Sequence, residues 1–140
     1  MLAAFTKQLL KAVPQDVSNT LLAYARFRHV PVPLLAALEQ QECLQQFLAA
    51  SNPQDLGNAG WAVGMLGHSS QQLAGGLLRQ AVKLLQQGSS RPICTDLSNL
   101  CWAVAVLDLR QNVPEVLQLA QAAGSSRVWG SAKPEDLLQL

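Results

Sequence analysis

The polar residues best suited to binding chemistry recur within a phrase that the chain repeats. The phrase reads PQDVSNTLLAYARF from Pro14, PQDLGNAGWAVGML from Pro53 and CTDLSNLCWAVAVL from Cys94. Each copy carries an acid, an asparagine three residues later and a hydrogen-bonding residue just before the acid. The acids are Asp16, Asp55 and Asp96, the asparagines are Asn19, Asn58 and Asn99, and the preceding residues are Gln15, Gln54 and Thr95. Amide and hydroxyl groups of this kind can hydrogen-bond to the edges of nucleic-acid bases.

Basic residues offer a second chemistry, the binding of phosphate groups. The candidates are Arg26 with Arg28, Arg79 with Lys83, and Arg127 in a Ser-Ser-Arg segment. The two pairs occupy different places in the repeat, so no regular basic stripe is indicated and scattered, solvated charge is the simpler interpretation. The net charge of +1 also counts mildly against binding by electrostatics alone.

No motif points to catalysis. The sequence has no Gly-rich phosphate loop, HExxH or GxSxG. His29 and His68 stand alone, and Cys43, Cys94 and Cys101 form no CxxC pair. We therefore expect no catalytic residue, metal, cofactor or small-molecule substrate, no enzyme activity, and a reducing compartment. No apolar run approaches the roughly 18 residues of a membrane span, so no membrane partner is expected.

Helices must position these residues. Leu, Ala and Gln dominate, aromatic residues make up 5%, and apolar residues follow each acid at the helical period. Pro14 and Pro53 suit the first turn of a helix, and Asn52 is a good N-cap. Trp61 and Trp102 stand among Leu and Val in mid-helix, so we expect them in the core rather than stacked on bases.

A second helix follows each repeated phrase. The first of these is expected from Pro33 to Ala50, the second begins at a Ser69–Gln72 capping box, and the third begins with Asn112 and Glu115 in the same relation. Gly88 and Gly124 stand where the left-handed residue after a helix belongs. The sequence therefore predicts an all-α protein, an α-solenoid of stacked antiparallel helix pairs with a period of about 40 residues.

The repeat also sets the expected domain organisation. Four acids, Asp16, Asp55, Asp96 and Asp136, lie 39, 41 and 40 residues apart. We expect a single array with units at 14–52, 53–93 and 94–133, a second helix of a truncated unit at 1–13, and the start of another at 134–140. Both ends thus suggest a piece of a longer protein. The amphipathic segment 1–13 also resembles an organellar transit helix, which is the less favoured interpretation.

The phrase PQDLxNxxWAVxxLG, with its period near 40, resembles the octotricopeptide (OPR) repeat. Pro53–Gly67 matches best, Asp96–Leu107 nearly as well, and Pro14–Phe27 has Leu22 in place of the tryptophan. The resemblance implies a helical array that binds single-stranded RNA in chloroplasts or mitochondria and acts in RNA stabilisation, processing or translation. It extends to the FAST-kinase-like helical region of RAP-domain proteins. Other proteins of an RNA-processing complex are further partners that it implies.

Each candidate RNA-binding residue has a structural alternative. Asn19, Asn58 and Asn99 can cap neighbouring backbone and the acids can serve the helix dipole, which is the favoured interpretation of both. The choice stays open for Gln15, Gln54 and Thr95. At the level of the whole chain, the alternative to RNA binding is a HEAT- or armadillo-like scaffold for protein–protein interaction, which suits the near-neutral charge and the Gln-rich second helices.

Overall fold

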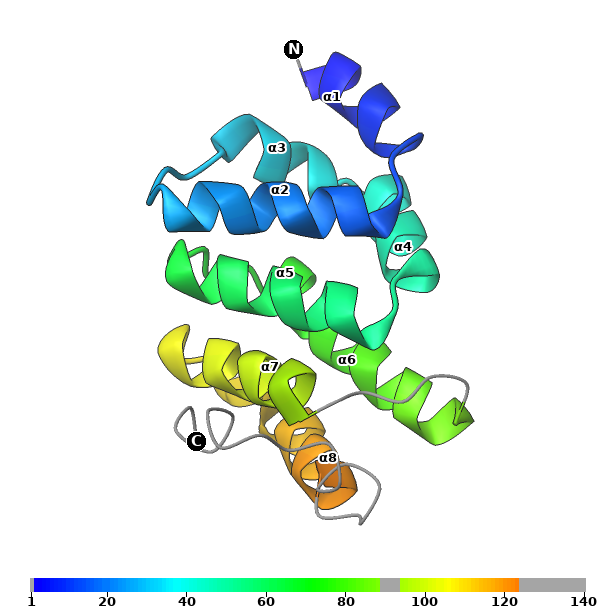
Figure 1. Ribbon diagram of the computed structural model, residues 1–140, viewed down its shortest axis with the longest axis vertical. Coiled ribbons are helices and arrows are strands. Elements are labelled where there is room, and N and C mark those ends of the chain that lie inside the picture. Colours follow the sequence, from blue (N-terminus) through cyan, green and yellow to red (C-terminus); the bar gives the residue numbers. More distant parts are fainter. Residues whose placement is uncertain (1, 89–93, 124–140) are drawn as a thin grey trace.

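The computed structural model describes residues 2–88 and 94–123, and over these ranges the protein is all-helical without a β-strand (Figure 1). The predicted all-α class is therefore confirmed for the described part. The helices are α1 Leu2–Leu9, α2 Pro14–Arg26, α3 Val32–Leu38, α4 Gln41–Ala50, α5 Pro53–Met65, α6 Gln71–Gln87, α7 Cys94–Val106 and α8 Val113–Ala123, with a 3-10 turn η1 at Arg110–Asn112.

The three repeated phrases form three equal helices that lie side by side. α2, α5 and α7 each have 13 residues. In Figure 1 they lie one below another and run in the same direction, and α5 packs against both α2 and α7. We call this set the repeat row, because it brings the same sequence positions into neighbouring places.

The other helices pack against the repeat row and against one another. α6 contacts α5 and α4, α8 contacts α6 and α7, and α1 contacts α3. Leucines from both sets fill the core between them, and the fully buried ones include Leu21, Leu56, Leu77, Leu100 and Leu119. The core is thus continuous along the described part of the chain. It contacts the repeat row on the side that faces the other helices.

Glycines bring α5 and α7 unusually close. A Cβ atom on Gly57 would lie 2.8 Å from the Cα of Asp96, and one on Gly64 would lie 2.6 Å from the ring of Trp102. Distances this short are not found between real side chains and backbone, so only glycine fits at Gly57 without movement of α7.

The helix ends confirm some caps and correct others. The Asn52 side-chain oxygen accepts from the backbone N–H of Asp55 at 2.8 Å, and the Asp55 carboxylate accepts from the N–H of Asn52 at 3.0 Å. Gly88 ends α6 with φ 63°, as predicted. The predicted box at Ser69 is wrong: Ser70 is the N-cap and accepts from the Leu73 N–H at 3.2 Å.

The predictions for the other second helices need two corrections. The helix expected from Pro33 to Ala50 is two helices, α3 and α4, because Gln40 is extended with φ −60° and ψ 135°. No Pro or Gly marks this break. We therefore attribute it to tertiary packing, which overrides the helical propensity of the local sequence. Asn112 lies in η1, where its buried side-chain oxygen accepts from Gln71 of α6 at 2.6 Å. Gly124 lies outside the described residues.

Each repeat-row helix ends in the same left-handed turn. Arg28, Gly67 and Asp108 have φ values of 54°, 65° and 52°, and each stands twelve residues after the acid of its phrase. In each turn the next N–H returns to a carbonyl five residues earlier, from His29 to Tyr24, from His68 to Val63 and from Leu109 to Val104. The exit from the helix is therefore the same in all three copies.

Candidate functional site

One side of α5 is left open, and the residues on it are those of the repeated motif. Every residue of α5 is buried except Gln54, Asn58, Trp61 and Met65. These four are spaced by four, three and four residues, which places them on one side of a helix. The other sides of α5 face α2, α7 and α6.

The same positions are open in the neighbouring helices. In α2 they are exposed or half-buried, and in α7 they are likewise not buried. We call this set the outward stripe: Gln15, Asn19, Leu22 and Arg26 in α2; Gln54, Asn58, Trp61 and Met65 in α5; Thr95, Asn99, Trp102 and Val106 in α7. Because packed helices lie roughly 8–10 Å apart, equivalent side chains form columns across the row at about that spacing.

The three asparagines of the outward stripe form one of these columns, and their side chains take no part in hydrogen bonds within the described part of the chain. Among the described residues, Asn19, Asn58 and Asn99 make no side-chain hydrogen bond, and none of the three is buried. The interpretation of these residues as caps of neighbouring backbone is therefore wrong. The acid of the same motif behaves differently, since Asp55 is buried and completes the capping box of α5.

The tryptophans are only partly buried. Trp61 and Trp102 are both half-buried on the outward stripe, each next to the asparagine of its own phrase. Trp61 packs partly against the core, and the ring of Trp102 lies over Gly64 of the preceding helix. The prediction that both belong to the core therefore holds only in part, because their position, six residues after the acid, lies on the open side of the repeat row.

Helix N-termini can bind phosphate through their free N–H groups, but those of the repeat row are poorly suited to it. Pro53 occupies the first turn of α5 and has no N–H, and the Asn52–Asp55 capping box uses a further N–H of that turn. Asp55 and Asp96 would also repel a phosphate placed there. The outward stripe is therefore a better candidate site than the N-terminal edge of the row.

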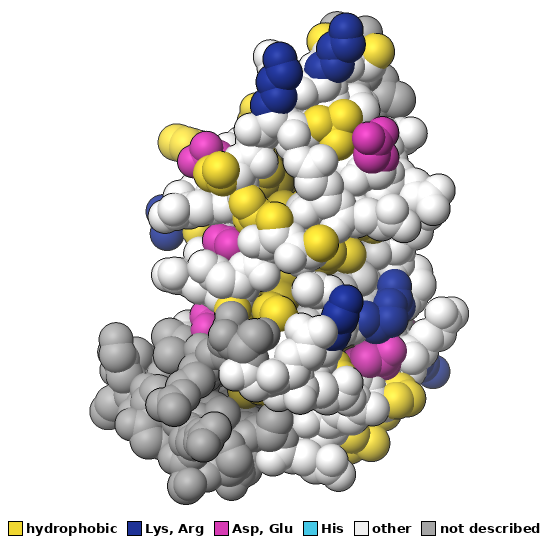
Figure 2. Space-filling model, turned by 90° about the vertical axis from the view of Figure 1, so that its right-hand side faces the viewer, with side chains coloured by type: hydrophobic (Ala, Val, Ile, Leu, Met, Phe, Trp, Pro, Cys, Tyr) yellow, Lys and Arg dark blue, Asp and Glu magenta, His cyan; other side chains and the backbone are white. Residues whose placement is uncertain are grey.

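The basic candidates lie in different places. Arg26 ends the outward stripe in α2, and Arg28 follows in the turn, both exposed. Arg79 and Lys83 lie on α6 and line an open groove of about 530 Å³ with α4, together with Gln45, Leu48 and Glu39. Figure 2 shows Lys and Arg side chains in separate groups rather than in one band. Arg127 lies outside the described residues.

No cluster of metal-binding type forms in the described ranges. Groups of three or more His, Cys, Asp or Glu that could hold a metal are absent there. Burial raises the pKa of the Cys101 thiol, and burial followed by the charge of Glu42 raises that of Cys43, so both thiols are protonated and unreactive near neutral pH. His68 pairs with Glu39 across two units. In these ranges no helix is both long and apolar enough to cross a bilayer.

The outward stripe includes residues that sequence reasoning did not choose. Leu22, Trp61, Met65, Trp102 and Val106 belong to it, although they were assigned to the core or left without a role. The spacing of Gln54, Asn58 and Trp61 could have indicated this, because residues spaced by four and three positions lie on the same side of a helix.

Comparison of the chain with protein-family models, with curated proteins and with solved structures finds no match.

Proposed function

We propose that the chain is an α-solenoid of antiparallel helix pairs that binds single-stranded RNA along the outward stripe. The column of Asn19, Asn58 and Asn99 carries the proposal. A side-chain amide that is repeated at one place, lies at the surface and has no partner within the described part of the protein is available to a ligand. A ligand that contacts all three amides in the same way must itself have a repeating structure.

Single-stranded RNA repeats in the required way. Helical-repeat proteins of other families read one base per repeat with two or three side chains, chiefly on the Watson–Crick and Hoogsteen edges. Here each unit offers one Asn and a Gln or Thr for hydrogen bonds. Trp61 and Trp102 stand beside the column and are half-buried, so they are placed where an adjacent base could stack on them.

Electrostatics contributes little in this arrangement. Of the basic candidates that the structure describes, Arg26 and Arg28 lie at the end of the outward stripe, whereas Arg79 and Lys83 lie on α6. With about two phosphate contacts, the logarithm of the binding constant should fall with a slope of roughly −1.4 against the logarithm of salt concentration. Binding should therefore be weak and only moderately sensitive to salt.

The cellular role follows from the resemblance of the phrase and not from the geometry. Pro53–Gly67 resembles the OPR motif, and this supports a role in RNA stabilisation, processing or translation in a chloroplast or mitochondrion. Other RNA-processing proteins are then expected partners.

Fluorescence anisotropy with labelled single-stranded RNA at two salt concentrations tests the proposal. We expect Asn58→Ala and Trp61→Leu each to weaken binding roughly tenfold, through loss of base hydrogen bonds and of stacking. Gln86→Ala is the matched control, because Gln86 is an exposed amide of α6 outside the stripe and should leave binding unchanged. Absence of binding at low salt, or equal loss in the control, would remove RNA as the ligand.

The second candidate function is a scaffold for protein–protein interaction. It is favoured by the apolar residues that share the stripe, since Met65 and Val106 are 42% and 48% exposed, and by the net charge of +1. A scaffold would bind no RNA at low salt.

A further inference from the structure

The side of α2 that faces away from α5 is open, although the corresponding sides of α5 and α7 are buried. In α5 the acid and the residues four and seven positions later, Asp55, Ala59 and Ala62, pack against α2. Their equivalents in α7, Asp96, Leu100 and Ala103, pack against α5. In α2 the equivalent residues are exposed, and we call them, with their neighbours, the α2 end face: Asp16, Thr20, Ala23, Tyr24 and Phe27.

The end face is apolar toward the C-terminal end of α2. Phe27 is 84% exposed, whereas its equivalent in α7, Leu107, is 9% exposed. Val30 and Val32 continue the apolar surface after the helix, with 43% and 65% exposure. A solvated phenylalanine at a position that is otherwise used for helix packing indicates a surface with a partner.

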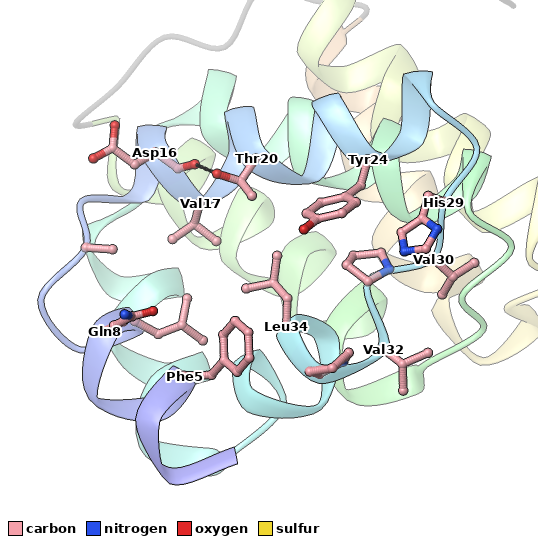
Figure 3. A pocket seen from close by; sticks show the side chains of 14 residues that line it. Phe5, Gln8, Asp16, Val17, Thr20, Tyr24, His29, Val30, Val32 and Leu34 are labelled. Atoms are coloured by element: carbon pink, nitrogen blue, oxygen red, sulfur yellow. Dashed lines mark hydrogen bonds between the residues drawn. The ribbon is translucent and has the colours of Figure 1, made fainter. Parts of the chain in front are cut away.

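A groove borders this face on the side of α1. It encloses about 470 Å³ between α1, α2 and the segment that leads into α3. Figure 3 shows Phe5 and Gln8 of α1 on one side of the groove and Asp16, Thr20 and Tyr24 along α2 on the other. The groove and the end face together leave this side of α2 without a repeat-row neighbour.

Charge is distributed along α2 in a way that favours a copy of α2 as the neighbour on this side. Asp16 lies at its N-terminal end and Arg26 and Arg28 at its C-terminal end, and all three are exposed. None of them has an ion-pair partner in residues 2–88 and 94–123. An antiparallel neighbour with the same sequence would supply the opposite charge at both ends.

We propose that the end face binds a second copy of this chain, with the two α2 helices antiparallel about a two-fold axis. If the axis passes between Thr20 and Ala23, each Thr20 meets Ala23 of the other copy, and these small side chains allow a close approach. The same rotation sets Asp16 of one copy opposite Phe27 of the other, between the two arginines. The interface is self-complementary and closes at two subunits.

Sedimentation velocity over a range of concentrations tests the proposal on the full chain. We expect a dimer whose dissociation constant rises about a hundredfold or more in Phe27→Glu, because a buried aromatic ring is replaced by a charge. Leu117→Glu is the control: Leu117 is 58% exposed on α8, away from the end face, and its loss should leave the dimer intact. Circular dichroism establishes that both variants keep their helices.

A charge exchange then identifies the geometry. Asp16→Arg places only positive charge at the contact, and the double variant Arg26→Asp with Arg28→Asp places only negative charge there, so each should dimerise roughly tenfold more weakly than the parent. An equimolar mixture should restore association, because opposite charges then meet at both ends of the antiparallel pair.

Three outcomes would overturn the proposal. These are a parent chain that stays monomeric at the highest concentration reached, a dimer that is insensitive to Phe27→Glu, and a mixture that associates no more tightly than its components. In the first case the end face serves another occupant, such as a helix of a different protein. Since RNA is absent from these measurements, they stand independently of the proposed function.

Discussion

α5 and α2 carry nearly the same phrase, yet their surroundings differ. α5 lies between α2 and α7, and only four of its 13 residues are not buried. α2 has a repeat-row neighbour on one side only, and its buried residues are Val17, Ser18, Leu21 and Ala25. The difference separates two kinds of repeat position. Those that are open in both helices lie at the surface of the repeat row, and those that are open only in α2 serve the stacking of one helix on the next.

The largest effect should come from a charge at a stacking position. Ala62→Glu buries a carboxylate between α5 and α2, where Ala62 is 0% exposed, and should cost at least about 3 kcal/mol of unfolding free energy. Ala23→Glu is the same change at the equivalent, exposed position of α2 and should alter the free energy by about 0.5 kcal/mol or less. Urea unfolding at a concentration at which the chain is monomeric measures both. Similar losses would show that the two positions are not equivalent.

A smaller effect is expected where α5 approaches α7. Gly57→Ala places a Cβ atom 2.8 Å from the Asp96 Cα, so the helices must separate, at a cost of about 2 kcal/mol. Ser18→Ala at the equivalent position of α2 removes a hydroxyl that donates to the Gln15 carbonyl at 3.1 Å, and should cost about 1 kcal/mol or less. Thermal unfolding compares the pair, and an unchanged Gly57→Ala variant would contradict the close approach.

The smallest effects concern the helix N-termini. Asn52→Ala removes the cap of α5 and should cost about 1 kcal/mol. The equivalent residue of α2, Val13, has an extended backbone, no side-chain cap and 55% exposure, and Asp16 already stands three residues later. Val13→Asn should therefore gain up to about 1 kcal/mol by completing the same box. A loss on Val13→Asn would mean that Val13 contributes more by packing than the open position suggests.

Local chemistry explains which parts of the fold were predictable. The starts of α2 and α5 follow from Pro14 and Pro53, the cap from Asn52, and the end of α6 from Gly88, because each is decided by one residue and its neighbours. The break between α3 and α4 was not predictable in this way, since Glu39 and Gln40 are neither helix breakers nor caps. It forms where Glu39 contacts His68 of the next unit.

The asparagines of the candidate site were predictable from the sequence, but the solvent exposure of the site's tryptophans was not. Asn19, Asn58 and Asn99 were identified from the repeat, whereas the partial exposure of Trp61 and Trp102 was missed. A helix that is apolar nearly all round is expected to be buried on all sides. Whether the side of α5 that carries the outward stripe is covered depends on where the helices outside the repeat row pack. The periodicity within one helix carries no information about their positions.

The turn after each repeat-row helix has a consequence for how such a chain can grow. Arg28, Gly67 and Asp108 adopt the same left-handed conformation, although only one of them is glycine. The same backbone hydrogen bond closes the turn in each case, so the path by which the chain leaves the helix does not depend on the residue there. A gene segment that encodes one unit can then be duplicated without adjustment of the junction. A further helix of the row would also have to present small residues to its neighbour, as α5 does to α7.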